Sequence, residues 1–418
     1  MAPVNTENNA YCKLYDVDIT LEKVYTTLKS LPIKFSEDHN GFSYAILKNG
    51  GIVLSTQITR LFKLSLSYSD IPKDWKKSVI LPIRKKGSAV STAEGFRPIS
   101  ITSCFCRTLE RIIRNSVVEF LDRNDIINKS QHGFRQRRST ASALLSYANV
   151  LSSALDSGMC IDAAYFDFSK AFDSVRHDHL IQKLANIGIA GNLLSWIMNY
   201  LSDRSQVVKI NSIISSEKQV TSGVIQGSVL GPLLFTIFVN DIDDNVNNCV
   251  LLKYADDIRI YRCFKACPAH QNENSYLFQT DVNALMAWSM RWDLKFNYSK
   301  CCILHFGRSN IRSPYKLNNH DLTEKKLEKD LGILFSVDFK FDDYIHLIAK
   351  KANKQLGLIT KVFSLKNPQV IIQLYKTFVR PHLEYNSIIW SPYTKKNENI
   401  IEKIQKKLCN ILYGRRSS

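Results

Sequence analysis

The spacing of apolar residues predicts a chain built from both helices and strands. Residues 103–123 and 177–187 carry apolar side chains every three or four positions, which is typical of helices with one buried face. The short apolar runs at 79–83 and 161–168 predict strands, the second of them buried. Residues 249–261 predict a β-hairpin with Ala255, Asp256 and Asp257 at its tip. We therefore expect an α+β fold.

The same pattern predicts how the chain is divided. Residues 344–413 should form three helical segments with lysine-rich exposed faces, separated near Asn367-Pro368 and Ser391-Pro392. Residues 266–280 and 307–325 are polar and suggest loop-rich spacers, and a break is expected at residues 48–51. We expect an N-terminal extension over residues 1–60, a central domain over 61–343 and a helical C-terminal segment over 344–418.

Charge narrows the classes of partner. The chain has 418 residues and a formal net charge of +18, which favours a polyanion. Nucleic acid and an anionic membrane surface both fit this charge. The longest apolar stretch, residues 223–239, contains Gln226, Ser228 and Pro232 and is short for a bilayer span, so it predicts buried core rather than a membrane segment.

Cysteine usage and the N-terminus indicate the compartment. The ten cysteines are scattered, which favours a reducing environment, and residues 1–16 lack the apolar core of a signal peptide. We expect an intracellular protein, nuclear or cytoplasmic, without a membrane partner. Cys263, Cys267 and His270 have spacing that suggests zinc, but no fourth ligand stands nearby, so a structural metal is not favoured.

Three aspartates stand where rigid carboxylates are expected. Asp167 ends an apolar strand, and Asp256 and Asp257 lie at the predicted hairpin tip. Mg²⁺ prefers oxygen ligands, and enzymes that transfer nucleotidyl groups use two divalent ions about 4 Å apart. An aspartate pair at a turn can also serve only the turn geometry. The neighbouring sequence blocks decide between these interpretations.

Five sequence blocks follow one another along the chain: FRPIS at residues 96–100, QHGFR at 131–135, DFSKAFD at 167–173, GVIQGSVLGP at 223–232 and YADD at 254–257. In this order they resemble the blocks of reverse transcriptases from non-LTR (LINE-type) retrotransposons of the Jockey and RTE kind. The resemblance implies a right-hand polymerase fold with fingers, palm and helical thumb. It implies an RNA-directed DNA polymerase that uses an RNA template, a DNA primer, dNTPs and two Mg²⁺ ions. Asp167, Asp256 and Asp257 would be the catalytic metal ligands.

The resemblance also implies roles at the nucleotide. Arg97 would contact the triphosphate, Gln226 and Gly227 would line the nucleotide site, Phe172 would select the sugar and Lys300 would protonate the leaving pyrophosphate. Each residue also has a plain structural interpretation. Arg97 could form a structural salt bridge, Phe172 could be a core aromatic residue, Gln226 and Gly227 could start a helix, and Lys300 could be a solvated surface lysine.

Two further segments resemble parts that hold the primer and template. Leu331 and Gly332 resemble the primer-grip turn, although the family more often has Tyr where Asp330 stands. Residues 379–385 and Trp390 resemble the thumb-side segment. Basic residues of the C-terminal helices and of the expected fingers should bind phosphates without reading bases; those of the fingers are Arg84, Lys85, Lys86, Arg135, Arg137 and Arg138.

Two rival functions remain open on the sequence. One is a catalytically silent retrotransposon remnant that keeps the fold or only binds RNA, and the other is a maturase-like splicing cofactor. Family members usually carry an endonuclease domain and continue further at the C-terminus, so we expect a fragmentary copy that does not transpose on its own. The intact catalytic residues argue against decay, and the DFSKAFD block and the C-terminal segment fit the retrotransposon group better than the maturases.

Overall fold

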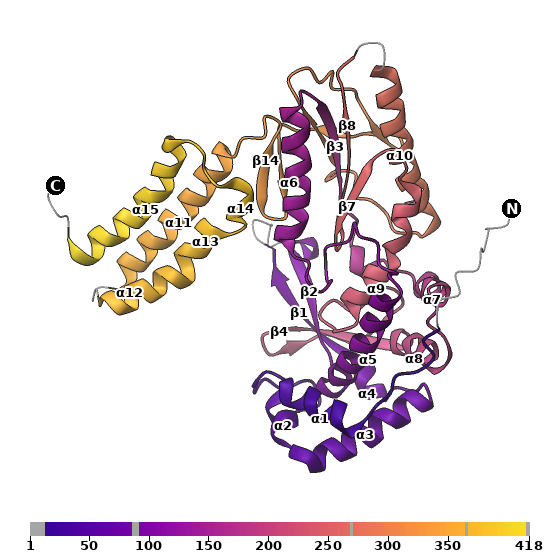
Figure 1. Cartoon of the computed structure of the whole chain (residues 1–418). Coiled ribbons are helices and arrows are strands. Elements are labelled where there is room, and N and C mark those ends of the chain that lie inside the picture. The colour runs from indigo at the N-terminus through magenta and orange to yellow at the C-terminus, as the bar shows by residue number, and fades with distance from the viewer. Residues whose placement is uncertain (1–12, 86–91, 268–270, 364–366, 415–418) are drawn as a thin grey trace. The chain divides into compact units, whose positions relative to one another are not determined.

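The computed structural model describes residues 13–85, 92–267, 271–363 and 367–414 (Figure 1). The chain folds into two compact units that interleave along the sequence. The first unit comprises Met1–Phe134, Phe168–Asn245 and Ala287–Phe296, and the second comprises Arg135–Asp167, Val246–Met286 and Asn297–Ser418. Helices and strands are mixed in both units, which confirms the α+β class. The domain boundaries drawn from the sequence stay a prediction.

The first unit begins with helices. These are α1 (Leu21–Ser30), α2 (Tyr44–Asn49), α3 (Gly51–Ser67) and α4 (Lys73–Lys76). The predicted break at residues 48–51 falls between α2 and α3. Gly51 has a φ of +63°, a conformation that glycine adopts without steric cost, so the chain can turn there before the next helix starts.

A mixed sheet and further helices complete the first unit. Its strands, in the order β2-β1-β4-β5 with β6 on β4, are β1 (Lys77–Arg84), β2 (Phe96–Ile101), β4 (Arg204–Ile210), β5 (Ile213–Ile214) and β6 (Lys218–Val220). Its helical segments are η1 (Ala93–Gly95), α5 (Cys104–Arg123), η2 (Ala171–Asp173), α7 (His177–Asn186), α8 (Gly191–Leu201), α9 (Gly231–Phe238) and η3 (Asn240–Asn245). The strand predicted at 79–83 and the helices predicted at 103–123 and 177–187 are confirmed. The apolar stretch at 223–239 is buried through most of α9, as expected.

The second unit is built on a five-stranded sheet in the order β12-β9-β3-β8-β7. Its strands are β3 (Cys160–Phe166), β7 (Val250–Tyr254), β8 (Asp257–Phe264), β9 (Cys302–Phe306) and β12 (Thr323–Glu324). The central strand β3 pairs antiparallel with both β8 and β9. Helix α6 (Thr140–Asp156) packs against β3 and β7. The buried strand and the hairpin predicted from the sequence are confirmed.

One expectation about loops is wrong. Residues 271–280, predicted as a polar spacer, belong to helix α10 (Gln271–Arg291). The helix is held by a few buried contacts rather than by a broad apolar face: Phe278 and Val282 are fully buried, and the Asp281 carboxylate accepts the backbone N–H groups of Asn248 (2.8 Å) and Cys249 (2.7 Å). Residues 307–325 contain the short strands β10 (Lys316–Leu317), β11 (His320–Asp321) and β12.

The C-terminal region is mainly helical, and residues of several of its helices, among them Leu356, Ile371 and Ile404, form a common core. It contains the hairpin β13 (Leu327–Asp330) and β14 (Ile333–Ser336), then α11 (Asp342–Val362), α12 (Pro368–Leu374), a π-helical turn (Tyr375–Val379), α13 (Arg380–Glu384), α14 (Ser387–Trp390) and α15 (Lys395–Tyr413). The predicted breaks near Pro368 and Pro392 are confirmed, but the middle segment is further divided. Pro381 lies in the first turn of α13, where its missing N–H is no loss. None of the described helices is both long enough and apolar enough to cross a bilayer.

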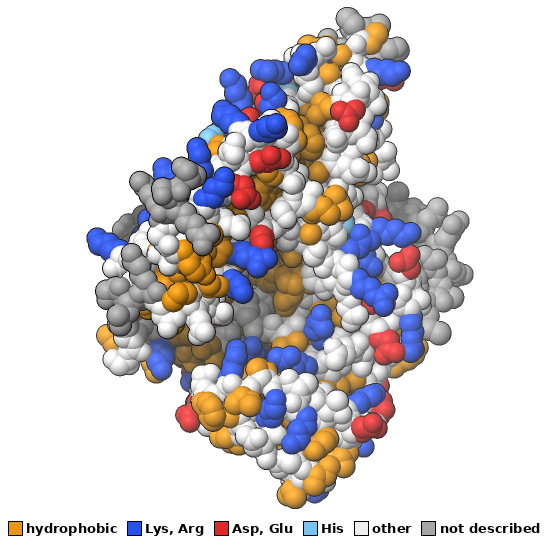
Figure 2. All heavy atoms as spheres, turned by 60° about the vertical axis from the view of Figure 1, so that its left-hand side comes forward, with side chains coloured by type: hydrophobic (Ala, Val, Ile, Leu, Met, Phe, Trp, Pro, Cys, Tyr) orange, Lys and Arg blue, Asp and Glu red, His pale blue; other side chains and the backbone are white. Residues whose placement is uncertain are grey.

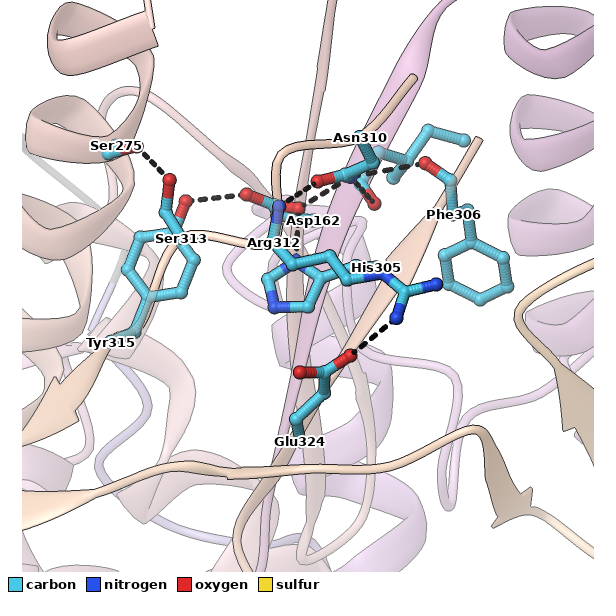
Figure 3. A network of polar contacts seen from close by, with 10 residues as sticks. Asp162, Ser275, His305, Phe306, Asn310, Arg312, Ser313, Tyr315 and Glu324 are labelled. Carbon is cyan, nitrogen blue, oxygen red and sulfur yellow. Dashed lines mark hydrogen bonds and ion pairs between the residues drawn. The ribbon is translucent and has the colours of Figure 1, made fainter. Parts of the chain in front are cut away.

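A buried polar network holds β3 to β9 and to the loop that follows β9 (Figure 3). The Asp162 carboxylate faces His305 Nδ1 at 2.6 Å, Asn310 Nδ2 at 2.8 Å and the Tyr315 hydroxyl at 2.5 Å. Asp162 and His305 are almost completely buried. Burial and the neighbouring Asp162 raise the pKa of the Tyr315 hydroxyl well above its usual range, so it stays a donor. Both carboxylate oxygens of Asp162 thus have hydrogen-bond partners.

Asp162→Asn is expected to destabilise the second unit. The amide would turn an N–H group toward donors and leave at least one buried group unpaired, which costs about 3 kcal/mol of unfolding free energy. Urea unfolding followed by fluorescence measures this change. The control is Asp321→Asn, an exposed carboxylate 3.8 Å from Lys316, which should stay within about 0.5 kcal/mol of the wild type. Equal stability of the two variants would show that the network is not needed.

Candidate active site

Two adjacent strand ends carry the three aspartates within the second unit. Phe166 of β3 lies opposite Ile258 of β8, so the next residues, Asp167 and Asp257, extend from the same end of the sheet. The backbone carbonyl of Asp167 accepts the Asn297 N–H at 2.7 Å, which fixes the chain where β3 ends. The sheet therefore brings together carboxylates that lie about ninety positions apart in the sequence.

The hairpin tip that carries the aspartate pair is a two-residue turn. Tyr254 pairs with Asp257, which leaves Ala255 and Asp256 between the strands. Ala255 is buried and has a φ of +57°, a region that side chains other than glycine rarely adopt. Strained backbone of this kind concentrates at functional sites, where the surrounding structure maintains it. The tip is thus a defined turn rather than a loose loop.

Loss of water and mutual repulsion act together on these carboxylates. The surrounding protein removes water from the Asp257 carboxyl, and the negative charges of Asp256 and Asp167 add to this effect, so its pKa rises to about 6. Arg259 and Lys300 act in the opposite direction. A bound cation would offset the repulsion between these carboxylates and so favour their ionised form.

Lys300 contacts this cluster directly. Its Nζ forms an ion pair with Asp167 Oδ2, while the rest of the side chain is largely solvent-exposed. The backbone N–H of Lys300 binds the Asn297 carbonyl at 3.0 Å, in the same turn that fixes Asp167. Lys300 is therefore an exposed lysine that pairs with Asp167, one of the expected metal ligands.

These carboxylate oxygens fit a hard divalent cation whose remaining ligands are water and substrate phosphates. Among the described residues, no three His, Cys, Asp or Glu side chains are close enough to form a metal site by themselves. Mg²⁺ usually keeps several waters and is bound through one or two carboxylates and substrate phosphates. The negative charges of Asp256 and Asp167 contribute, after desolvation, to the raised pKa of Asp257, so these carboxylates lie near one another. Asp167, Asp256 and Asp257 are the residues that would hold such an ion.

The first unit gathers the residues expected at the nucleotide. The Ser100 N–H donates to the Gln226 carbonyl at 2.8 Å, which joins β2, the strand of Arg97, to the loop before α9. Gly227 has a φ of +115°, and a Cβ there would lie 2.7 Å from the Ser100 carbonyl oxygen, so only glycine fits. Arg97 is exposed and Gln226 is half-buried, so both side chains can reach a ligand.

The turn that carries Phe172 joins the same loop. The Phe172 carbonyl accepts the Val224 N–H at 2.7 Å. The turn and the loop also approach closely at Gly223, where a Cβ would lie 2.8 Å from Asp173 Cα. The Phe172 ring stacks on the buried Phe235 of α9, with centroids 4.7 Å apart, and remains half-buried. Three sequence blocks that lie far apart in the chain therefore meet within this unit.

The sequence pattern did not reveal the residue that anchors this loop. The buried Glu110 of α5 accepts the backbone N–H groups of Val229 (2.7 Å) and Leu230 (3.0 Å) at the start of α9. A carboxylate at a helix N-terminus satisfies donors that the helix leaves unpaired. The only available sign was a charged residue on the helix face that the apolar spacing predicts to be buried.

Two residues of the predicted sites lie outside the described residues. His270 of the cysteine–histidine cluster and Lys86 of the basic set both lie there. Cys263 and Cys267 are described and are free thiols, as are Cys104, Cys106, Cys160, Cys249, Cys301, Cys302 and Cys409. The zinc alternative therefore keeps only its first two candidate ligands within the described structure.

Comparison with known proteins gives one consistent result. A family model described as reverse transcriptase (RNA-dependent DNA polymerase) matches residues 83–358. The chain is similar to the probable RNA-directed DNA polymerase from transposon BS of Drosophila melanogaster, with 28% identity over 93% of this chain and 44% of that protein. It is also similar to the RNA-directed DNA polymerase from mobile element jockey of the same species, with 25% identity over 95% of this chain and 44% of that protein. The chain thus spans less than half the length of these relatives.

Proposed function

This chain belongs to the reverse transcriptase (RNA-dependent DNA polymerase) family, and on that premise we propose that it copies RNA into DNA as the polymerase of a non-LTR retrotransposon. The substrates are dNTPs, which are added to the 3′-hydroxyl of a DNA primer paired with an RNA template. The observation that carries the proposal is the convergence of Asp167 with Asp256 and Asp257 at adjacent strand ends.

In this proposal the three aspartates hold two Mg²⁺ ions. Bound there, the ions supply activation of the attacking hydroxyl and stabilisation of the leaving oxygen. Lys300 stays beside Asp167 with its ammonium group exposed, where it can deliver a proton to the departing pyrophosphate. The stiff hairpin tip and the fixed end of β3 keep the carboxylates in one geometry, which precise nucleotidyl transfer requires.

The same proposal assigns the parts of a right-hand polymerase. The five-stranded sheet with the aspartates serves as the palm, the mixed sheet with β1 and β2 as fingers and residues 344–418 as the thumb. Residues 1–60 precede them as an extension. Arg97 binds the triphosphate, Gln226 and Gly227 line the nucleotide site and Phe172 excludes ribose. The joined backbones of β2, the Phe172 turn and the loop before α9 support this grouping.

A primer-extension assay tests the function. Purified protein, an RNA template with an annealed DNA primer, dNTPs and Mg²⁺ should give template-length DNA, and omission of Mg²⁺ should abolish it. The second candidate, a silent remnant that only binds RNA, has the same fold and charge. It predicts tight RNA binding without any extension, so measuring both properties in one preparation separates the two functions.

The basic surface of the chain supports a nucleic-acid partner. Figure 2 shows Lys and Arg side chains spread over the visible face, with fewer Asp and Glu side chains among them. The C-terminal helices α11 and α15 contribute exposed lysines on their outer faces, as expected. These are Lys350, Lys354, Lys361, Lys395, Lys396, Lys403, Lys406 and Lys407.

Affinity for the primer–template is therefore expected to fall steeply with salt. Each neutralised phosphate releases a counterion, so the log–log slope of affinity against salt should be roughly the number of phosphates contacted. Removal of one phosphate-binding lysine, as in Lys354→Ala, should reduce the slope by about 1. Fluorescence anisotropy between about 50 and 200 mM salt measures both slopes.

The control for this measurement is Lys29→Ala, an exposed lysine of α1 that lies in the proposed N-terminal extension. It removes the same charge but should leave the slope unchanged. Binding that does not depend on salt would contradict the phosphate-contact hypothesis. An equal change in both variants would show that overall charge, rather than local contact, sets the affinity.

A further inference from the structure

The turn between β13 and β14 has a sharply defined backbone. Asp330 pairs with Ile333, which leaves Leu331 and Gly332 as a two-residue loop. Both have positive φ angles, +42° and +94°. Positive φ at both central residues is the mark of a type I′ turn, which joins antiparallel strands tightly. This is the turn whose sequence resembles a primer grip.

A buried ion pair attaches one side of this turn to the sheet of the active site. Asp330, the last residue of β13, pairs with Arg259 of β8, and both side chains are buried. The Arg259 guanidinium also lies over the Tyr147 ring, 4.7 Å from its centroid. Side chains two apart on a strand share a face, so Arg259 projects on the same side of β8 as Asp257. The turn is thereby connected to the strand that carries a catalytic aspartate.

A tyrosine holds the other side. The Tyr385 hydroxyl donates to the Leu331 carbonyl at 2.8 Å. Its ring packs against Gly332, where a Cβ would lie 3.0 Å from Tyr385 Cε1. Tyr385 is itself anchored, because its carbonyl accepts the indole N–H of the buried Trp390 at 2.8 Å, and Trp390 packs edge-on against Tyr344. The ring of Tyr385 therefore sits on a fixed support.

We propose that Arg259 and Tyr385 are positioning residues that clamp the Leu331–Gly332 turn and thereby place the primer 3′-hydroxyl relative to Asp257. This inference rests on the proposed polymerase function. Neither residue needs to touch the nucleotides, since both act through the turn. Placement matters because a displacement of about 1 Å in a reacting group can cost roughly 100-fold in rate.

The clamp also gives a reason for Asp330. Without a carboxylate at that position, the buried Arg259 would lose one of its anionic neighbours. In the folded protein, the buried charges of Arg259 and Asp330 therefore stabilise each other. This chain has an ion pair at the position where the resemblance leads us to expect a tyrosine.

Tyr385→Phe tests the clamp with little risk to folding. Tyr385 is 41% exposed, and the change removes only its hydroxyl. Single-turnover incorporation of one dNTP on a preformed primer–template complex should slow roughly fivefold to tenfold. The dissociation constants of the primer–template and of the dNTP should stay within about twofold of the wild type, as should the reaction amplitude. Tyr393→Phe, at a 71% exposed tyrosine, is the matched control and should behave like the wild type.

A purely structural role would give a different result. Loss of folded protein lowers the amplitude but leaves the rate constant of the remaining molecules unchanged, and that outcome would overturn the proposal. An inactive wild type would instead overturn the polymerase function, and the clamp with it. An active wild type with an unaffected Tyr385→Phe variant would refute the clamp alone.

Asp330→Asn provides a second, independent test. It keeps the shape of the side chain and removes the charge that faces Arg259, so the rate constant should again fall. Because both substitutions act on one turn, the double variant should be slowed by clearly less than the product of the single effects. Effects that multiply would show that Asp330 and Tyr385 act separately.

Discussion

Asp256→Asn is expected to reduce RNA-templated primer extension by about two orders of magnitude or more. The substitution keeps the size of the side chain but removes a negative charge needed to hold divalent cations. RNA binding should persist, because phosphate contacts by lysine and arginine do not involve this residue. Extension rates and anisotropy of the same preparation measure the two properties. Near-normal synthesis by the variant would refute the assignment of the site.

A control and a second readout sharpen this test. Asp343→Asn removes an exposed carboxylate from the first turn of α11 and should leave extension unchanged. In the absence of metal, Asp256→Asn should be more stable than the wild type, although its extension activity is lower. The pKa of Asp257 is raised to about 6, above its unfolded value of about 4, so its ionisation opposes folding at pH 7.5. Removal of the neighbouring Asp256 charge relieves part of that cost, so the variant should melt at a higher temperature.

The pH dependence of the stability of the wild-type protein follows from the same raised pKa of Asp257. As the pH falls through about 6, Asp257 takes up a proton, and its destabilising ionisation disappears. The metal-free protein should therefore gain stability from this group between pH 7 and pH 5. Asp256→Asn should show a smaller gain over that range, because its Asp257 has lost one repelling neighbour.

Phe172→Val is expected to admit ribonucleotides. The resemblance places this aromatic ring at the sugar of the incoming nucleotide, where its bulk leaves no room for a 2′-hydroxyl. The kcat/KM ratio of dNTP over rNTP should fall by roughly 1–3 kcal/mol or more. The backbone should stay in place, since the Phe172 carbonyl binds the Val224 N–H whatever the side chain. Steady-state kinetics with matched dNTP and rNTP pairs measure the ratio.

Phe172→Tyr is the matched control. It keeps the aromatic ring and its stacking on Phe235, so discrimination should be retained. A Phe172→Val variant that loses dNTP activity and gains no use of ribonucleotides would show that Phe172 serves only as packing against Phe235. The polymerase proposal would survive that result, but the sugar gate would not.

Local patterns in the sequence were sufficient for most elements. Apolar spacing located α5, α7, β3 and the β7–β8 hairpin within a few residues, because each buries one continuous face or run. It failed at α10, where residues 271–280 are polar and the helix is fixed by a few distant contacts such as those of Asp281. Propensity and periodicity carry no information about such contacts.

The sequence also supplied the candidate chemistry, through the order and content of its motifs. Asp167, Asp256 and Asp257 were identifiable because strand ends and hairpin tips are where rigid carboxylates are expected. Their partners were not identifiable in this way. The Lys300–Asp167 pair, the Glu110 carboxylate under the start of α9 and the buried Arg259–Asp330 pair join residues 71 or more positions apart.

The sequence by itself determined the family and the α+β class, since these follow from ordered motifs and local pattern, and it supplied the candidate carboxylates and the expectation of a polyanionic partner. The tertiary structure decided which charges face one another, and therefore the raised pKa of Asp257 and the support of the Leu331–Gly332 turn. The physical reason is that strand register and buried contacts are set by packing over the whole unit. A register shift of one residue in β8 would turn the side chains of Asp257 and Arg259 to the opposite face of the sheet.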